Sequence, residues 1–136
     1  FRKKVTLRNR LAIKRFISYR LLEYGRTGCE INYIFCSDKD LLAINRQHLD
    51  HDYYTDIITF DLSETIGSGH LISDIYISTD RVKENAALAG NAFSSELLRV
   101  MFHGILHLIG YKDKTDKEQK QMRAMEEEWL QHFLNS

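Results

Sequence analysis

The chain has no proline, only two cysteines, no net charge and no long apolar run. Because no run approaches the roughly 18 apolar residues that a membrane span needs, we expect no membrane partner. Lysine plus arginine and aspartate plus glutamate number 19 each, so affinity for a polyanion would need a local basic patch. With no visible secretory signal and 43% hydrophobic residues, the sequence predicts one cytoplasmic domain over residues 1–136.

The two cysteines are placed so that they cannot readily pair. Cys29 and Cys36 fall in one predicted strand, seven residues apart. Side chains at an odd spacing in a strand point to opposite faces, which makes a disulfide between them implausible. We therefore expect two reduced thiols, as is usual in the cytoplasm.

Apolar residues at helical spacing predict a first helix that stops near Gly25 and Gly28. Its apolar positions are Leu7, Leu11, Ile13, Ile17, Leu21 and Leu22. Strands are expected over residues 30–36, 57–61 and 71–78. The candidate N-caps of the later helices are Ser37, Thr79 or Asp80, Ser94 or Ser95, and Thr115, the last in a capping box with Glu118. Because helices and strands interleave, we predict an α/β fold: a single layer of mixed sheet packed with helices.

His103 and His107 are the most informative pair in the chain. Residues four apart share one face of a helix, so both imidazole rings can reach one ion. The segment around them is apolar on almost all sides, which indicates a buried helix, and a shared cation would satisfy two buried rings. Gly110 can end that helix and bring Asp113 back toward the rings. The pattern predicts a metal held by His103, His107 and Asp113 with one open position, packed and hydrogen-bonded histidines being the alternative.

Gly104 excludes one class of metalloenzyme. Peptidases with the H-E-x-x-H motif carry a glutamate beside the first histidine as general base, and this chain has a glycine there. A peptidase of that type is therefore not expected. The base must come from elsewhere, or a metal-bound water must suffice.

Residues 103–113 read H-G-I-L-H-L-I-G-Y-K-D, which resembles the H-G-x-L-H-L-x-G-Y-D-H signature of the YbeY family of metal-dependent endoribonucleases. Residues 96–102 resemble the run that leads into this signature, and residues 73–78 resemble the family's G-D-I-x-I-S strand. Asn45 and residues 55–60 resemble its L-N and T-N-V-L-S-F segments. The resemblance extends over about residues 30 to 130. It implies a single-strand endoribonuclease that acts on ribosomal RNA and ribosomal particles, in ribosomal RNA maturation and ribosome quality control.

Two positions depart from the family pattern. Asp113 stands where the family usually has a third histidine, and two histidines with a carboxylate suit zinc but also iron, manganese or nickel. The place of the family's functional arginine falls on Leu49. Arg46, nearly one helical turn earlier, is the candidate replacement.

Other polar residues allow both a functional and a structural interpretation. Glu96 lies two turns before His103 and is a candidate base or hydrogen-bond partner, or else a complement to the helix dipole. Asp74 matches the aspartate of G-D-I, which implies hydrogen bonding around the site. The acids at 126–128 are expected on a solvated helix face. Four further polar residues could approach the metal site or bind an additional ion, but a polar surface turn is the favoured interpretation: His48, Asp50, His51 and Asp52.

Basic residues gather in the first 26 positions. They form a solvated helix face or a track for phosphates. The set is Arg2, Lys3, Lys4, Arg8, Arg10, Lys14, Arg15, Arg20 and Arg26.

Two further functions fit the same residues. One is a hydrolase of another class, since the ligand set does not distinguish a phosphoester from an amide. The other is a ribosome-associated binding protein with a structural metal. A fourth protein ligand such as Asp116 would favour a structural metal, and an apolar specificity pocket would favour a peptide or small-molecule substrate.

Overall fold

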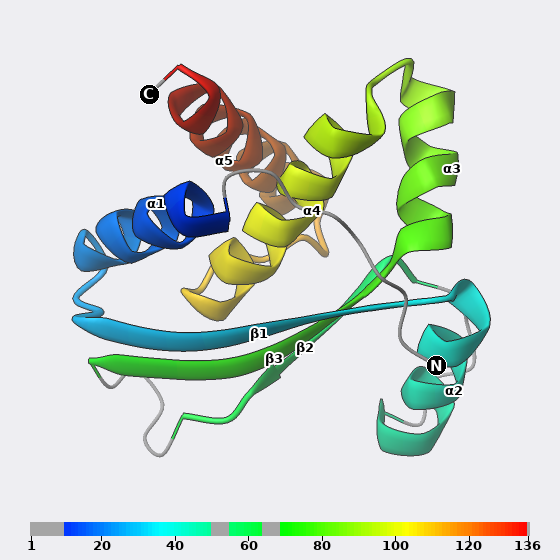
Figure 1. The fold of residues 1–136 in the computed structure, drawn as a ribbon, viewed down its shortest axis with the longest axis horizontal. Helices are drawn as coiled ribbons and strands as arrows, with labels where there is room; N and C mark the ends of the chain where they lie inside the picture. Colours follow the sequence, from blue (N-terminus) through cyan, green and yellow to red (C-terminus); the bar gives the residue numbers. More distant parts are fainter. Residues whose placement is uncertain (1–9, 50–54, 64–68, 136) are drawn as a thin grey trace.

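The computed structural model describes residues 10–49, 55–63 and 69–135, and the elements interleave as predicted (Figure 1). In chain order they are α1 (Arg10–Leu22), β1 (Gly28–Cys36), α2 (Asp38–Leu49), β2 (Ile57–Asp61), β3 (His70–Ser78), α3 (Thr79–Ala89), α4 (Phe93–Leu108) and α5 (Asp116–Leu134).

The three strands form one mixed sheet in the order β1-β3-β2. β1 runs parallel to β3, with Ile31 opposite Ser73, and β2 runs antiparallel to β3, with Phe60 opposite Asp74. Helices α1, α4 and α5 lie on one side of the sheet and α2 packs on the other side near one end (Figure 1). The predicted α/β layer is confirmed, and β2 is an edge strand of the described sheet.

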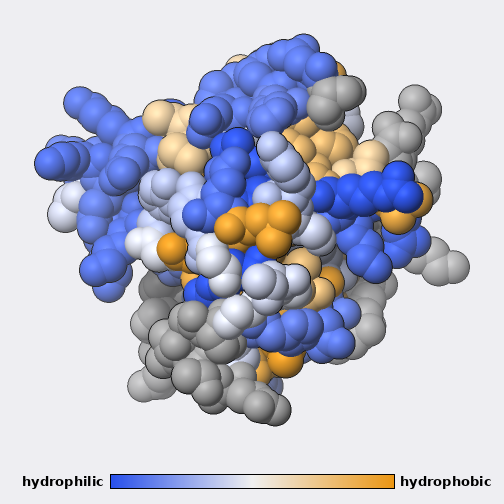
Figure 2. Space-filling view, turned by 90° about the vertical axis from the view of Figure 1, so that its left-hand side faces the viewer, coloured by the Kyte–Doolittle hydropathy of each residue, from blue (hydrophilic) through white to orange (hydrophobic). Residues whose placement is uncertain are grey.

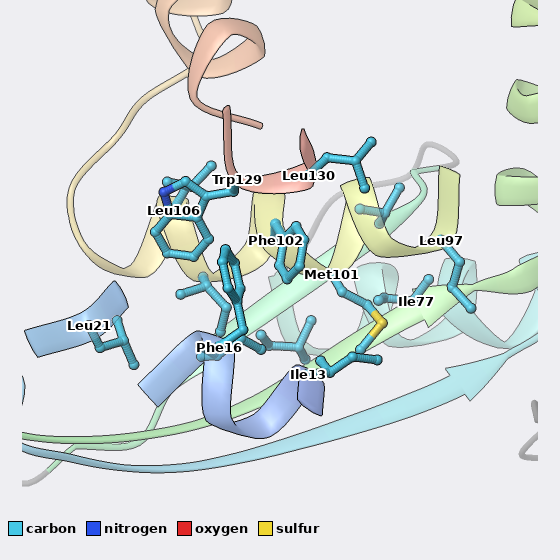
Figure 3. Close-up of a cluster of buried hydrophobic side chains, with 14 of the residues drawn as sticks. Ile13, Phe16, Leu21, Ile77, Leu97, Met101, Phe102, Leu106, Trp129 and Leu130 are labelled. Carbon is cyan, nitrogen blue, oxygen red and sulfur yellow. The ribbon is translucent and has the colours of Figure 1, made fainter. Parts of the chain in front are cut away.

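The main core lies between the sheet and the three covering helices. Phe102 of α4 and Trp129 of α5 are fully buried, and their rings meet edge to face with centroids 5.9 Å apart. Phe16 of α1 joins them, 5.4 Å from Phe102 and 6.0 Å from Trp129 (Figure 3). Aromatic pairs at these separations stabilise beyond the area that they bury. The prediction that the histidine helix is buried is confirmed.

Helix α4 approaches the sheet most closely at Gly104. A Cβ atom at that position would lie 3.0 Å from Ile57 Cδ1 and 3.2 Å from Ile75 Cδ1. Those distances are shorter than ordinary van der Waals contact. The absence of a side chain at residue 104 therefore lets α4 rest directly on β2 and β3.

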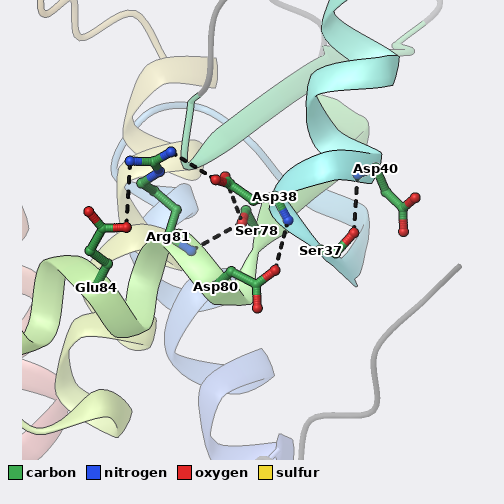
Figure 4. A network of polar contacts seen from close by, with 7 residues as sticks. All are labelled: Ser37, Asp38, Asp40, Ser78, Asp80, Arg81 and Glu84. Carbon is green, nitrogen blue, oxygen red and sulfur yellow. Dashed lines mark hydrogen bonds and ion pairs between the residues drawn. The ribbon is translucent and has the colours of Figure 1, made fainter.

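A polar network joins the start of α2 to the start of α3 (Figure 4). The Asp38 carboxylate accepts hydrogen bonds from Ser78 Oγ at 3.2 Å and from the Arg81 guanidinium at 2.8 Å. The Asp80 carboxylate accepts one from the backbone N–H of Asp38 at 3.0 Å. The network holds α2 in a fixed position beside the sheet.

The structure corrects two of the predicted helix caps. Ser78, not Thr79 or Asp80, caps α3, because Ser78 keeps the extended backbone of β3 and accepts a hydrogen bond from the Arg81 N–H. Neither Ser94 nor Ser95 caps α4, which begins at Phe93 after Ala92 with no side-chain cap. The predicted cap at Ser37 and the capping box of Thr115 with Glu118 are confirmed.

The inner face of α1 also differs from its prediction. Leu11 and Leu22 are each 58% exposed, whereas Phe16 and Arg20 are buried. The Arg20 guanidinium lies 5.1 Å from the centre of the Trp129 ring and contacts Glu128 at 3.2 Å. It anchors α1 to α5 by a cation–π contact and an ion pair.

Fewer of the predicted basic side chains are accessible to phosphates than the sequence suggests. Arg20 and Arg26 are buried and cannot contact phosphates. Arg2, Lys3, Lys4 and Arg8 lie outside the described residues. Of the predicted set, the structure places three on the surface: Arg10, Lys14 and Arg15.

The remaining fold predictions concern the thiols and the surface. Cys29 packs against the main core and Cys36 lies in a second cluster on the opposite face, so both are free as expected. The face at the left of Figure 1 is mostly hydrophilic, with apolar side chains in small areas (Figure 2). Within the described ranges, no helix combines the length and apolar character needed to cross a bilayer.

Candidate metal centre

The chain reverses direction directly after the histidine helix. α4 ends at Leu108, and Gly110 has a φ of +113°, a region that side chains rarely adopt. The backbone N–H of Tyr111 then donates to the carbonyl of Leu106 at 3.0 Å. The predicted turn at Gly110 is confirmed, and it carries the following residues back alongside α4.

The turn brings together the three residues that the sequence predicts as ligands. His103 Nε2 lies 3.4 Å from Asp113 Oδ2. The rings of His103 and His107 are nearly parallel, with an angle of 4° between them and centroids 6.4 Å apart. All three side chains border one cavity of about 330 Å³.

Each histidine has its Nδ1 atom engaged by an oxygen. His103 Nδ1 lies 2.5 Å from Glu126 Oε2, and His107 Nδ1 lies 3.1 Å from the carbonyl oxygen of Tyr111. A neutral imidazole that donates from Nδ1 keeps a lone pair on Nε2 for an ion. This carboxylate or carbonyl behind a histidine is the usual support of a metal ligand.

The prediction that the acids at 126–128 lie on a solvated helix face is wrong for Glu126. Its side chain is 12% exposed, whereas those of Glu127 and Glu128 are 50% and 57% exposed. A signal was present in the sequence, because Met122, Glu126, Trp129 and Leu130 share the spacing of one helix face. All four are buried in α5.

Asp56 is a second functional candidate that received no role from the sequence. It borders the cavity, and burial raises the pKa of its carboxyl group, although the charge of His103 opposes this. Burial has the opposite effect on His103 and lowers its pKa, but the hydrogen bond and charge of Glu126 outweigh burial and raise the pKa of His103. The Asp56 carboxyl and the His103 imidazole at this cavity therefore both have raised pKa values.

The other predicted site residues lie elsewhere. Glu96 does not border the cavity and lies 3.9 Å from Arg99, and Arg46 is exposed on α2 outside the cavity lining. The catalytic roles of Glu96 and Arg46 stay predictions. The prediction that Asp74 makes hydrogen bonds around the site is wrong. Asp74 accepts a hydrogen bond from Asn32 on the face of the sheet away from the histidines.

The structure also places parts of the predicted polar turn. His48 belongs to the last turn of α2 and stands against Phe60, with ring centroids 6.2 Å apart. Asp50, His51 and Asp52 lie outside the described residues.

Two imidazoles and a carboxylate, from His103, His107 and Asp113, are ligand types that suit a divalent ion. Across residues 10–49, 55–63 and 69–135, no three histidine, cysteine or acidic side chains form a ready-made cation site as they stand. His103 and Asp113 instead contact each other directly. The Asp113 side chain is 42% exposed, so the carboxylate is not held in place by burial.

Comparison with known proteins shows which family this chain belongs to. The family model described as "Endoribonuclease YbeY" matches residues 3–134. This chain belongs to the YbeY family. A YbeY relative from Cytophaga hutchinsonii, named an endoribonuclease, is 53% identical over 121 residues, which are 89% of this chain and 83% of the relative. Another, from Flavobacterium psychrophilum, is 48% identical over 118 residues, 87% of this chain and 82% of the relative.

A solved structure shares the fold of this chain. A solution structure of a Thermotoga maritima protein superposes with a TM-score of 0.61 at 27% identity, covering 96% of this chain and 86% of that one. Leu49, the position to which the resemblance assigns the YbeY arginine, does border the cavity. The cavity therefore has an apolar side chain at that place.

Proposed function

We propose that this protein is a metal-dependent endoribonuclease that cleaves single-stranded RNA during ribosomal RNA maturation and ribosome quality control. Membership of the YbeY family supports an endoribonuclease. The observation that carries the proposal is the pair of histidines whose Nδ1 atoms are both engaged, beside Asp113 at one cavity. Such an arrangement suits an ion that keeps an open position for a substrate.

His103, His107 and Asp113 would hold the ion, with zinc, iron, manganese and nickel as candidates. When bound, it would polarise the scissile phosphate and activate water or a neighbouring hydroxyl for attack.

The protein's own groups prepare the site. Glu126 fixes the His103 ring, and the Tyr111 carbonyl fixes the His107 ring, so neither has to be reoriented. The carboxyl of Asp56, whose pKa is raised, can hold or accept a proton at the cavity wall.

Two features of the cavity bear on the alternative functions. Asp116 is not among its described lining residues, which favours an open position over a four-ligand structural site. The described lining also holds no lysine or arginine, so phosphates away from the ion need contacts from elsewhere. Exposed Lys14 and Arg15 on α1 are the candidates.

The test is cleavage of a single-stranded RNA after the purified protein is loaded with each metal in turn. We expect cleavage by the parent and its loss in His107→Ala, with His70→Ala, an exposed histidine outside the cavity, as the matched control. Metal content of the His103→Ala, His107→Ala double variant is measured in parallel. Cleavage or metal retained at the parent level in that variant would contradict the proposal.

A further inference from the structure

A second groove lies across strand β2 from the histidine cavity. It has a volume of about 470 Å³ and runs between α2 and the sheet face that α2 only partly covers. Thr59 borders the histidine cavity, whereas the next residue, Phe60, borders the groove. Adjacent residues in a strand point to opposite faces, so β2 separates the two hollows.

Three rings form the aromatic wall of this groove. Phe60 meets Tyr76 edge to face with centroids 5.8 Å apart, and it meets His48 in the same way at 6.2 Å. Each ring therefore holds its neighbour in a fixed orientation. Aromatic side chains of this kind are the surfaces on which the bases of single-stranded RNA stack.

Polar groups with unused hydrogen-bonding capacity among the described residues surround the rings. In the part of the chain that the structure describes, no hydrogen bond engages the Asp40 carboxylate, the Gln47 amide or the Tyr76 hydroxyl. Oδ1 of Asp74 accepts from Asn32 at 3.1 Å, and its Oδ2 accepts from no other described residue. The Asp40 carboxylate points away from the network around Asp38 (Figure 4). These groups are available to a ligand in the groove.

The charge of the lining selects the kind of ligand. Its described residues include two carboxylates, Asp40 and Asp74, and no lysine or arginine. Such a surface repels a phosphate. An ionised carboxylate only accepts hydrogen bonds, so it pairs with an amino group, as it does with the amino group of cytosine. Uracil has no such group.

We propose that the groove binds a base with an exocyclic amino group, from a nucleotide that flanks the cleavage position in the RNA. This inference rests on the proposed function and adds a specificity subsite to it. The base would stack on Phe60 and Tyr76 and donate its amino group to Asp40 or Asp74. Because β2 is an edge strand of the described sheet, an RNA strand can pass around it from the histidine cavity to the groove.

The experiment uses nucleosides, which carry no phosphate and do not need the metal. The full chain, labelled with ¹⁵N and kept in chelator, is titrated with cytidine and with uridine and followed by NMR. We expect cytidine to shift the amide signals of Ala43, Ile44, Gln47 and Tyr76, and to bind at least about fivefold more tightly than uridine.

Variants test the two parts of the subsite separately. Phe60→Leu should weaken cytidine binding about tenfold, whereas Tyr19→Leu, which removes an exposed ring on α1, should not. His48→Ala, at an exposed position of α2, tests the same wall if Phe60→Leu fails to fold. Asp74→Asn should reduce the preference for cytidine over uridine.

The outcomes separate this inference from the proposed function. Equal binding of both nucleosides, or amide shifts confined to other surfaces, overturns the subsite even if the protein cleaves RNA. Cytidine binding at the groove in a protein that cleaves no RNA supports the subsite and contradicts the proposed function.

Discussion

His103 of α4 and Glu126 of α5 are joined by a contact of 2.5 Å between Nδ1 and Oε2, across 23 positions of sequence. Arg99 lies on the other side of the same carboxylate, 3.9 Å from Oε1. The orientation of the first predicted ligand therefore depends on the packing of two helices. This relationship makes α5 part of the site.

Glu126→Gln should weaken metal binding by about 10–100-fold, the usual effect of removing the group behind a metal-bound histidine. The amide cannot offer His103 a charged acceptor. Glu127→Gln is the matched control, because Glu127 pairs with Arg99 and Gln131 and not with a histidine. Competition with a chromophoric chelator measures both affinities. Equal affinities in the two variants would show that Glu126 does not support the ligand.

Asp113→Asn should weaken metal binding by about 100-fold or more, because a neutral amide replaces an anionic oxygen that binds the ion directly. This loss should be larger than that of Glu126→Gln, which changes only the group behind a ligand. Asp113→His should retain the metal, since it restores the family pattern. Calorimetric titration of the metal into each variant gives the affinities, with Asp116→Asn as the control. If Asp113→Asn binds as tightly as the parent, Asp116 becomes the next candidate ligand.

Gly110→Ala should lower the free energy of unfolding by about 1–2 kcal/mol and also weaken metal binding. No atom would obstruct its Cβ, so the effect is confined to the backbone at positive φ. Gly90→Ala has the same property at a φ of +71°, and Gly90 is the C-cap of α3. Urea denaturation should show similar losses in both variants, and metal titration should show a loss only at residue 110. A matching loss of metal at Gly90→Ala would contradict this account.

The raised pKa of Tyr24 should make the free energy of unfolding fall as the pH rises above 10. Burial, followed by the hydrogen bond and charge of Tyr111, raises the pKa of Tyr24 from 10.0 to about 12. The unfolded chain loses this proton from pH 10, while the folded chain holds it up to about pH 12. The contribution is therefore complete below pH 10 and is lost between about pH 10 and 12. Urea unfolding at pH 8, 10 and 11.5 should show a steeper decline in the parent than in Tyr24→Phe.

RNA binding should weaken as salt rises, because a protein with no net charge can contact a polyanion only through a local patch. Charge reversal at Arg8, Lys14 and Arg15 should weaken binding further and reduce the salt dependence, by about 0.7 in the logarithmic slope for each phosphate that the variant no longer neutralises. Fluorescence anisotropy with a labelled single-stranded RNA measures both effects. If the charge-reversal variant binds the RNA as tightly as the parent, the basic residues of α1 form a solvated helix face and do not contact phosphates.

The parts of the site that are local in sequence were predictable. His103 and His107 share a helix face by their spacing alone, and a glycine at residue 110 indicates where the chain turns. The same holds for the three strands, whose apolar patterns have sharp limits. Each of these signals involves residues within about one or two helical turns of each other.

The contributions that depend on packing between distant elements were missed. Glu126 reaches His103 only because α5 crosses α4 in the core, and charge alone suggested a solvated residue. Arg20 is buried for a similar reason, since Trp129 offers a ring and Glu128 a carboxylate. The Asp74 error arose from the resemblance, which located the residue in a strand but not on a face of the sheet.

Gly104 has a consequence for which reactions the site can acquire. The H-E-x-x-H enzymes place their base at this position, but Gly104→Glu would bring a Cβ to 3.0 Å from Ile57 Cδ1 and 3.2 Å from Ile75 Cδ1. Either these isoleucine side chains must shift or α4 must move away from the sheet together with His103. A glutamate base at residue 104 therefore also requires smaller side chains at residues 57 and 75 beneath the helix.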